Sequence, residues 1–250
     1  MSLETSRASF PSPGAEPSRE LAAPVVPRLG LLALSAALAL AGLWGLTSAI
    51  LAPAPLPLPL DRESAAASAA WRQSAQWAAW LGVLRGDLYA RAAFAGGEAA
   101  FLEKPASSDP EAAARIARTR ANALSAVSLA PINGAVWLLL AELPAGPDRK
   151  VEDAERANAV LTSYFTAPND PRLASARLQR ALALAPGANG DLIEFIKADL
   201  RQVLGDGAPA KAALAAALKT APQASKDAFL AAIAEIDPNF ARQLRGEPAR

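Results

Sequence analysis

The chain has 250 residues, 52% of them hydrophobic, and its 25 basic side chains nearly balance 24 acidic ones. It contains no histidine and no cysteine, which excludes disulfides, thiol chemistry, Cys/His metal sites and catalysis by an imidazole base. A formal net charge of +1 gives no electrostatic reason to expect nucleic acid as a partner.

Residues 1–28 are rich in proline and serine and show no periodic apolar face. Such a segment cannot bury enough apolar surface to offset the entropy cost of ordering it. We therefore expect residues 1–28 to form a disordered cytoplasmic tail.

Residues 29–52 carry no charged side chain. As a helix they are about 36 Å long, which is enough to cross a bilayer with some tilt. The hydroxyls of Ser35, Thr47 and Ser48 can bond to a carbonyl one turn back, so they cost little in lipid. A buried core helix and a cleaved signal peptide are the alternatives, but the apolar region of a signal peptide is usually shorter, about 7–15 residues. We favour an uncleaved single transmembrane helix.

The orientation of this helix follows from its flanking arginines. Arg28 directly precedes it, and Arg62 is the first basic residue on the other side. Basic residues concentrate on the cytoplasmic side of a span. The sequence therefore predicts a cytoplasmic N-terminus and an extracytoplasmic C-terminal domain.

Small residues recur at every fourth position of the expected span. They are Ala33, Ala37, Ala41, Gly45 and Ala49. Small residues at this spacing let two transmembrane helices approach closely, so they are a candidate helix-association face that would join the chain into a homo-oligomer. A chance stripe in an alanine-rich sequence is the interpretation that we favour.

Residues 53–60 place proline at every second position as far as Pro59. Proline fixes φ and prevents a helix. This predicts an extended Pro-rich spacer that holds the next domain roughly 20 Å from the bilayer.

Residues 61–250 predict one all-α domain, because strand patterns are nearly absent and alanine, the strongest helix former, dominates. Asp109, Asn133, Asp170 and Asp237 mark helix starts, since such residues cap a helix N-terminus. We expect about eight or nine helices with short connections, which makes neighbouring helices antiparallel.

An apolar stripe follows Asp61 in the first long helix that we expect. It comprises Trp77, Trp80, Leu81, Leu84 and Leu88, which lie at helical spacing. So large an apolar face should be covered, either by neighbouring helices or by a partner. We expect it to be buried within the domain.

Three expected helix ends look alike: ALSAVSLAPIN at 123–133, RALALAPGAN at 180–189 and AALKTAP at 216–222. With Trp137 and Leu140 following the first, they resemble tetratricopeptide repeats, although the glycine and tyrosine landmarks of that repeat are missing. The resemblance implies stacked helix pairs that present a surface to a protein partner. Alanine- and leucine-rich hairpins without a repeat are the alternative.

More loosely, the single span, the helical domain and the segment RGDLYARAAF at 85–94 resemble single-span envelope proteins of alpha-proteobacteria. Some of those proteins accompany polysaccharide assembly. The resemblance implies a single-pass protein of the bacterial inner membrane, with its C-terminal domain in the periplasm.

We recognise no catalytic, cofactor-binding or metal-binding motif in the sequence. Acidic residues gather near two expected helix starts, where they favour the positive end of the helix dipole; they are Glu152, Asp153, Glu155, Asp191 and Glu194. Arginines gather at 115–120 and at 172–180, and we expect solvated surfaces there in preference to a polyanion groove.

The sequence thus predicts a membrane-anchored, non-enzymatic interaction or scaffold protein with a protein partner in the bacterial envelope and no cofactor. One alternative is an accessory factor in the assembly or export of cell-surface polysaccharide. The other is an enzyme that acts on glycans with carboxylates alone.

Overall fold

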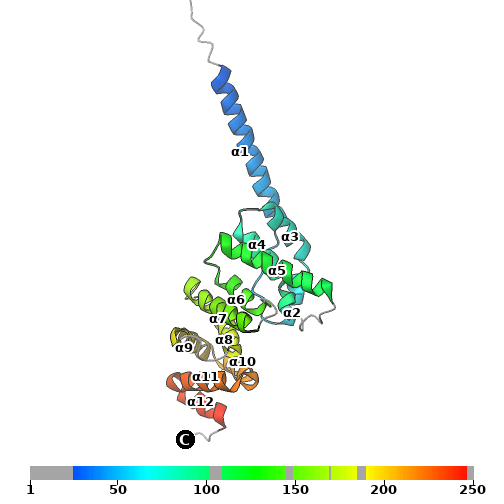
Figure 1. The fold of residues 1–250 in the computed structure, drawn as a ribbon. Coiled ribbons are helices and arrows are strands. Elements are labelled where there is room, and N and C mark those ends of the chain that lie inside the picture. The colour runs from blue at the N-terminus through cyan, green and yellow to red at the C-terminus, as the bar shows by residue number, and fades with distance from the viewer. Residues whose placement is uncertain (1–24, 102–108, 145–148, 169, 185–189, 247–250) are drawn as a thin grey trace, which may run out of the picture. The chain divides into compact units, whose positions relative to one another are not determined.

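Figure 1 shows the chain as a computed structural model, which describes residues 25–101, 109–144, 149–168, 170–184 and 190–246. These residues form twelve α-helices and one 3-10 helix, without a strand. The predicted all-α fold is therefore confirmed, whereas residues 1–24 of the expected tail lie outside the described residues. The chain divides into two compact units, residues 1–43 and 44–250.

Helix α1 runs from Val25 to Leu51. Its stretch Leu29–Leu51 is the one helix in the described residues that is long and apolar enough to cross a membrane, a property that a signal sequence shares. Thr47 Oγ1 donates to the carbonyl of Trp44 at 2.8 Å, and Ser48 Oγ to that of Gly45 at 2.8 Å. These hydroxyls are satisfied within the helix, as predicted.

The helix-association face of α1 stays a prediction. Ala33, Ala37, Ala41 and Ala49 are exposed, and Gly45 is partly buried. Nothing crowds the Gly45 Cα, because a β-carbon built there would meet no atom within 4 Å.

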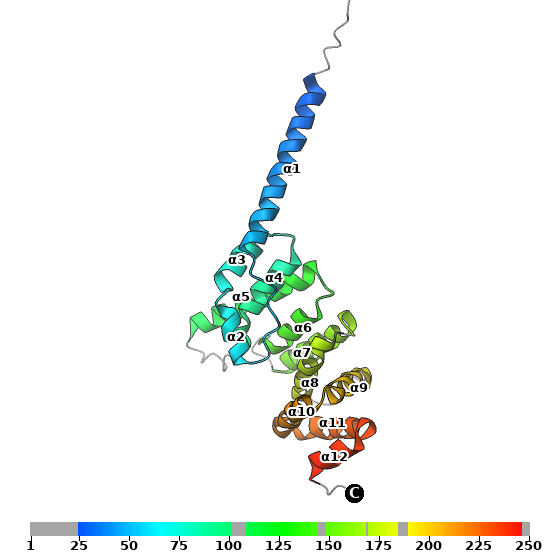
Figure 2. The same cartoon turned by 180° about the vertical axis from the view of Figure 1, so that it is seen from behind.

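Eleven α-helices follow α1 in the described residues, as Figures 1 and 2 show from opposite sides. They are α2 (Arg62–Ala69), α3 (Arg72–Leu81), α4 (Gly86–Ala95), α5 (Pro110–Leu129), α6 (Gly134–Glu142), α7 (Arg149–Thr166), α8 (Pro171–Ala183), α9 (Gly190–Gly205), α10 (Ala208–Thr220), α11 (Gln223–Ile236) and α12 (Pro238–Arg245), with the 3-10 helix η1 (Gly97–Phe101) after α4. From α3 to α9 each helix packs against the next one in the chain, and α11 packs against α8, α9 and α12.

The predicted capping residues begin the helices as expected. The side chains of Asp109, Asn133, Asp170 and Asp237 each accept a hydrogen bond from a backbone N–H in the first turn, at 3.0–3.3 Å. Each cap satisfies a donor that has no partner inside the helix, which is why the starts could be predicted.

The helix that we expected to begin after Asp61 is broken into α2, α3 and α4, so the number of helices exceeds eight or nine. After the second break α4 begins at Gly86. A β-carbon on Gly86 would lie 2.9 Å from the Ala130 β-carbon, so glycine lets α4 start close against α5. The first break, at Ala70 and Trp71, contains neither glycine nor proline, and no residue type marks it.

Two large apolar clusters form most of the core, and α8 contributes to both. Leu173 and Ala176 belong to the first, with residues of α4 to α7. Ala174 and Leu178 belong to the second, with residues of α9 to α12. A smaller third cluster joins α3 to α4.

Residues 53–60 contain no helix, as predicted, but they lie on the domain and do not stand free. Leu58 and Pro59 are buried, and Arg91 Nη1 donates to the carbonyl of Pro53 at 2.6 Å. The segment is therefore not free-standing, because residues among these prolines find apolar partners in the core, whereas the distance of the domain from a bilayer stays a prediction.

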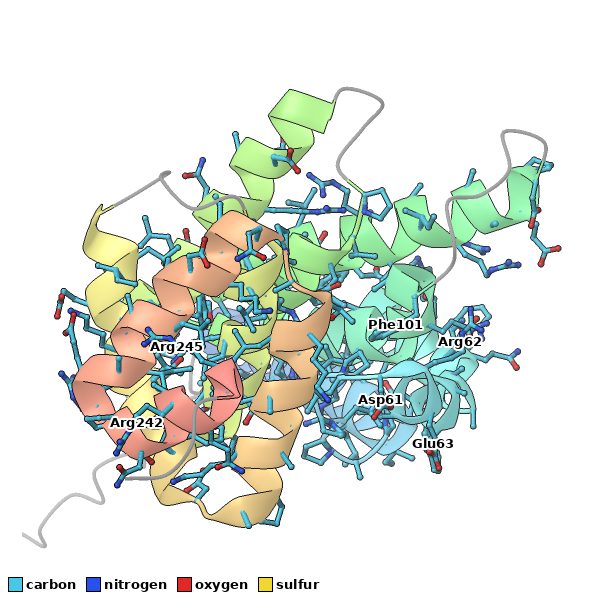
Figure 3. All side chains as sticks on the ribbon, turned by 90° about the horizontal axis from the view of Figure 1, so that it is seen from below. Asp61, Arg62, Glu63, Phe101, Arg242 and Arg245 are labelled. Carbon is cyan, nitrogen blue, oxygen red and sulfur yellow. The ribbon has the colours of Figure 1, made fainter. Side chains whose placement is uncertain are left out.

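The end of this segment is fixed beside η1 (Figure 3). Asp61 caps α2 by accepting from the backbone N–H of Ser64 at 2.7 Å, and Arg62 Nη2 donates to the carbonyl of Phe101 at 3.3 Å. Both ends of residues 53–60 are thus tied to the domain.

Candidate functional site: a groove lined by α3, α4 and α5

The described residues form an open groove with a volume of about 1110 Å³. One wall is α3, the opposite wall is α5, and α4 with the start of η1 forms the floor. Its lining residues are Ala69, Ala70, Arg72, Gln73, Gln76, Trp77, Ala79, Trp80, Tyr89, Ala92, Gly96, Glu98, Glu111, Arg115, Arg118, Thr119 and Asn122.

One face of α3 carries small side chains, and the opposite face carries large ones. Ala75, Ala78 and Ala79 are buried against α4, whereas Trp77 and Trp80 are 53% and 64% exposed. The alanines let the two helices approach closely, which leaves the indoles outside. The expected burial of the tryptophan stripe is therefore wrong for both tryptophans.

The rest of that stripe is divided by the end of α3. Leu88 belongs to α4 and is fully buried, whereas Leu84 lies in the turn after α3 and is 82% exposed. A stripe read as one helix face is thus shared between two helices and a turn.

Trp77 and Trp80 form an aromatic pair at the edge of the groove. Their ring centroids are 5.8 Å apart, and the ring planes are nearly perpendicular. Edge-to-face packing of this kind holds two indoles in a fixed arrangement. Large rigid aromatic surfaces with this exposure are typical of binding sites.

Ion pairs occupy the polar walls. Arg72 Nη2 lies 2.6 Å from Glu98 Oε1, and Arg115 Nη1 lies 3.0 Å from Glu111 Oε1. The exposed Arg118 guanidinium donates to the carbonyl of Ala114 at 3.4 Å, a long contact. Three arginines against two glutamates leave the lining with a net positive charge.

Amide and hydroxyl groups of α3 and α5 also line the groove. The Asn122 amide reaches Gln76 Oε1 at 3.5 Å, and Thr119 Oγ1 donates to the carbonyl of Gly96 at 3.1 Å. Gly96 is required there, because a β-carbon would lie 2.5 Å from Thr119 Oγ1. The Nε–H donors of Arg72 and Arg115 are buried and have no acceptor among the described residues, so acceptor groups are in short supply.

The two arginine clusters of the sequence have different surroundings. Arg115 and Arg118 line the groove, and Arg120 bonds to Glu155 at 2.6 Å. In the second cluster Arg172 is exposed, as expected, but Arg177 and Arg180 are buried. The expectation of a solvated surface is wrong for these two.

The acidic clusters are spread over the surface. Glu155 pairs with Arg120, and Glu194 pairs with Lys197 at 3.2 Å. The side chains of Glu152 and Asp191 lie outside the described residues. The part of the chain that the structure describes holds no group of three or more metal-ligating side chains.

Sequence reasoning did not single out Gln73, Gln76 or Asn122. A signal was present, since Gln73, Gln76, Trp77 and Trp80 lie at i, i+3, i+4 and i+7 of α3 and thus share one helix face. A face that mixes amides with indoles is better suited to a ligand than to a dry core.

Comparison of the chain with protein-family models, curated proteins and solved structures finds no match. The groove therefore has to be interpreted from its own chemistry.

Proposed function

We propose that the protein is a membrane-anchored, non-enzymatic interaction protein of the bacterial envelope. In this proposal α1 is an uncleaved span, its N-terminus is cytoplasmic, and the helical domain lies in the periplasm. The groove lined by α3, α4 and α5 holds a segment of a protein partner. The observation that carries the proposal is the exposure of Trp77 and Trp80 beside it.

The lining defines what such a segment would offer. Indole faces bind apolar or aromatic side chains, and the net positive wall around Arg118 favours a carboxylate. Unpaired Nε–H donors and amide groups favour a ligand rich in acceptors, such as a peptide backbone. An extended acidic segment with one or two large apolar residues fits these requirements.

The state of the carboxylates supports binding over catalysis. A general acid and a general base must be able to reach a substrate proton. Glu98 and Glu111 each bind an arginine through Oε1, at 2.6 and 3.0 Å. The glycan-cleaving alternative would need both pairs to open.

The helix packing supports tetratricopeptide-like stacking beyond the groove. Successive helices pack side by side from α5 to α9, and Trp137 Nε1 donates to the carbonyl of Pro131 at 2.9 Å. Two residues of the repeat-like segment are thus joined directly. Helix pairs that stack in this way present extended surfaces to partners.

Site-specific photocrosslinking in cells tests the proposal. The full chain carries a photoreactive amino acid at the exposed position Gln73, and Gln243 on α12 is the matched surface control. We expect a discrete protein adduct from Gln73 and none from Gln243. The Trp77→Ala and Arg118→Ala changes should remove the adduct without altering the melting temperature.

The outcome that contradicts the proposal is equally specific. An adduct that persists in both variants, or that forms equally from Gln243, would show that the groove does not select the partner.

A second candidate is an accessory role in the assembly or export of surface polysaccharide. Indole faces beside Gln73, Gln76 and Asn122 favour it, because sugar rings stack on indoles and bond to amides. The test is deletion of the gene followed by measurement of surface polysaccharide. Unchanged amount and chain length would dismiss this candidate.

A further inference from the structure

We infer that two turns of the domain, Gly82–Arg85 and Ala130–Asn133, dip into the lipid–water interface beside the end of α1. The apolar surface concerned comprises Val83, Leu84 and Ile132 of these turns and Leu129 at the end of α5, and we call it the turn patch. The ligand is the bilayer itself. The inference rests on the proposed function in one respect, namely that α1 is an uncleaved span.

The end of α1 is joined to the end of α3. Trp44 Nε1 donates to the carbonyl of Leu81 at 2.6 Å, and Ser48 is buried. Ala52 packs against the cluster that contains the small face of α3. The last turns of α1 and the last turn of α3 therefore lie side by side.

This junction sets the depth of the α3–α4 turn. Trp44 lies about two turns before the end of α1 at Leu51, which is roughly 10 Å along the helix axis. With α1 across a bilayer, Trp44 is inside the outer boundary of the apolar span. Leu81, which accepts its hydrogen bond, then lies below the outer end of the apolar span, and the turn that follows it reaches the interfacial level where tryptophans gather.

The turn patch is apolar and uncovered at that level. Val83 and Leu84 are 56% and 82% exposed, and Leu129 and Ile132 are 40% and 77% exposed. The two turns adjoin, because a β-carbon on Gly86 would lie 3.1 Å from the Leu129 β-carbon. Large apolar side chains clustered in this way need a cover other than water.

The charges beside the turn patch are paired, which indicates that apolar side chains and not charges attach it to the bilayer. Arg85 is the basic residue next to Leu84, and its Nη2 lies 2.8 Å from Asp87 Oδ2. The patch therefore carries little net charge of its own. Its attachment should not require anionic lipids and should persist at high salt.

The chain has no cysteine, so one introduced cysteine gives a unique labelling site. We would attach an environment-sensitive fluorophore to full-length Leu84→Cys and Ile132→Cys variants in phosphatidylcholine bilayers. Lipids with a nitroxide beside the headgroup should quench both labels several-fold more than a label at Gln243→Cys on α12. The Leu84 and Ile132 side chains are exposed, so the changes should leave the circular dichroism spectrum unaltered.

A label at Leu40→Cys, in the middle of the candidate span, separates the inference from the proposed function. Quenching there by acyl-chain nitroxides, with Leu84 as open to an aqueous quencher as Gln243, overturns the inference alone. A Leu84 label shielded from both quenchers also overturns it, because a protein then covers the patch. Loss or aqueous exposure of the Leu40 label overturns the anchor and the inference together.

Discussion

Arg177 lies in surroundings that its charge alone would not predict. It is fully buried in α8, and its guanidinium stacks 4.7 Å from the centre of the Tyr164 ring. Its nitrogens donate to Ser163 Oγ at 3.2 Å and to the carbonyls of Ser163 and Ala167. Asp199 lies 3.8 Å away. These partners replace the water that the cation loses on burial.

Burial also acts on the acidic partners of Arg177. Desolvation raises the pKa of Asp199 above its ordinary value, although the Arg177 charge opposes this. Desolvation likewise raises the pKa of Tyr164, and the negative charge of Asp199 adds to it. Tyr164 is therefore neutral over the physiological range.

Removing Arg177 should be strongly destabilising. Arg177→Ala leaves Asp199 buried without its cation, and breaking a buried pair in this way costs about 3–5 kcal/mol. Thermal unfolding of the full chain in detergent micelles, followed by circular dichroism, measures the loss. The exposed neighbour Arg172 is the control, and Arg172→Ala should leave the melt nearly unchanged. Equal melts for the two variants would contradict the buried-pair assignment.

The divided tryptophan stripe gives a second comparison. Trp80 is 64% exposed, so Trp80→Ala removes little buried area, whereas Leu88 is fully buried in α4. Leu88→Ala should lower the free energy of unfolding by about 2–5 kcal/mol, and Trp80→Ala by far less. Melts of both variants under one condition check this. A larger loss for Trp80→Ala would mean that the indole is buried after all.

At the level of helices, the sequence predicted starts better than faces. Asp109, Asp170 and Asp237 could be placed because a cap is a local device whose chemistry is complete within four residues. Which side of α3 is buried could not be predicted, since both Ala78 and Trp77 are apolar. The choice depends on how closely α4 approaches, which is a tertiary property.

The groove was harder to foresee for the same reason. Glu98 and Arg115 come from η1 and α5, and no spacing in the sequence relates them to α3. The burial of Arg177 was also hidden, because its partners Ser163 and Asp199 lie on two other helices.

The N-terminus of α12 should be sensitive to acid. Lys211 Nζ bonds to Asp237 Oδ2 at 2.7 Å, and the N–H of Phe240 donates to Oδ1 at 3.0 Å. The lysine bond and then the backbone bond hold the pKa of Asp237 below its ordinary value. The stabilisation is therefore complete above about pH 4, the unfolded carboxyl value, and is lost as the pH falls through the lower folded value.

Asp237→Ala removes both interactions. It should cost about 0.5–2 kcal/mol near neutral pH, as for other N-caps, and the difference from the wild-type chain should shrink in acid. Unfolding curves over a pH series measure this. A difference that stays constant down to the lowest pH would show that the carboxylate charge does not contribute.

Across the whole domain, packing runs mainly between successive helices. The first large cluster reaches from α4 to α8 and the second from α8 to α12, with α8 in both. In the described residues, α4 and α11 do not pack against each other to any substantial extent. In such an arrangement a local loss of stability reaches its neighbours first and distant helices last.

Ile233 allows this to be tested, because it is fully buried in α11 and belongs to the second cluster. Ile233→Ala should cost about 2–5 kcal/mol and should speed amide hydrogen exchange in α9 to α12. Exchange in α4 and α5 should stay at the wild-type rate, and Leu88→Ala should give the reverse pattern. Mass spectrometry of the full chain in micelles resolves both ends in one experiment. If either change sped exchange evenly from α4 to α12, the domain would unfold as one unit, and α8 would transmit stability between the two clusters.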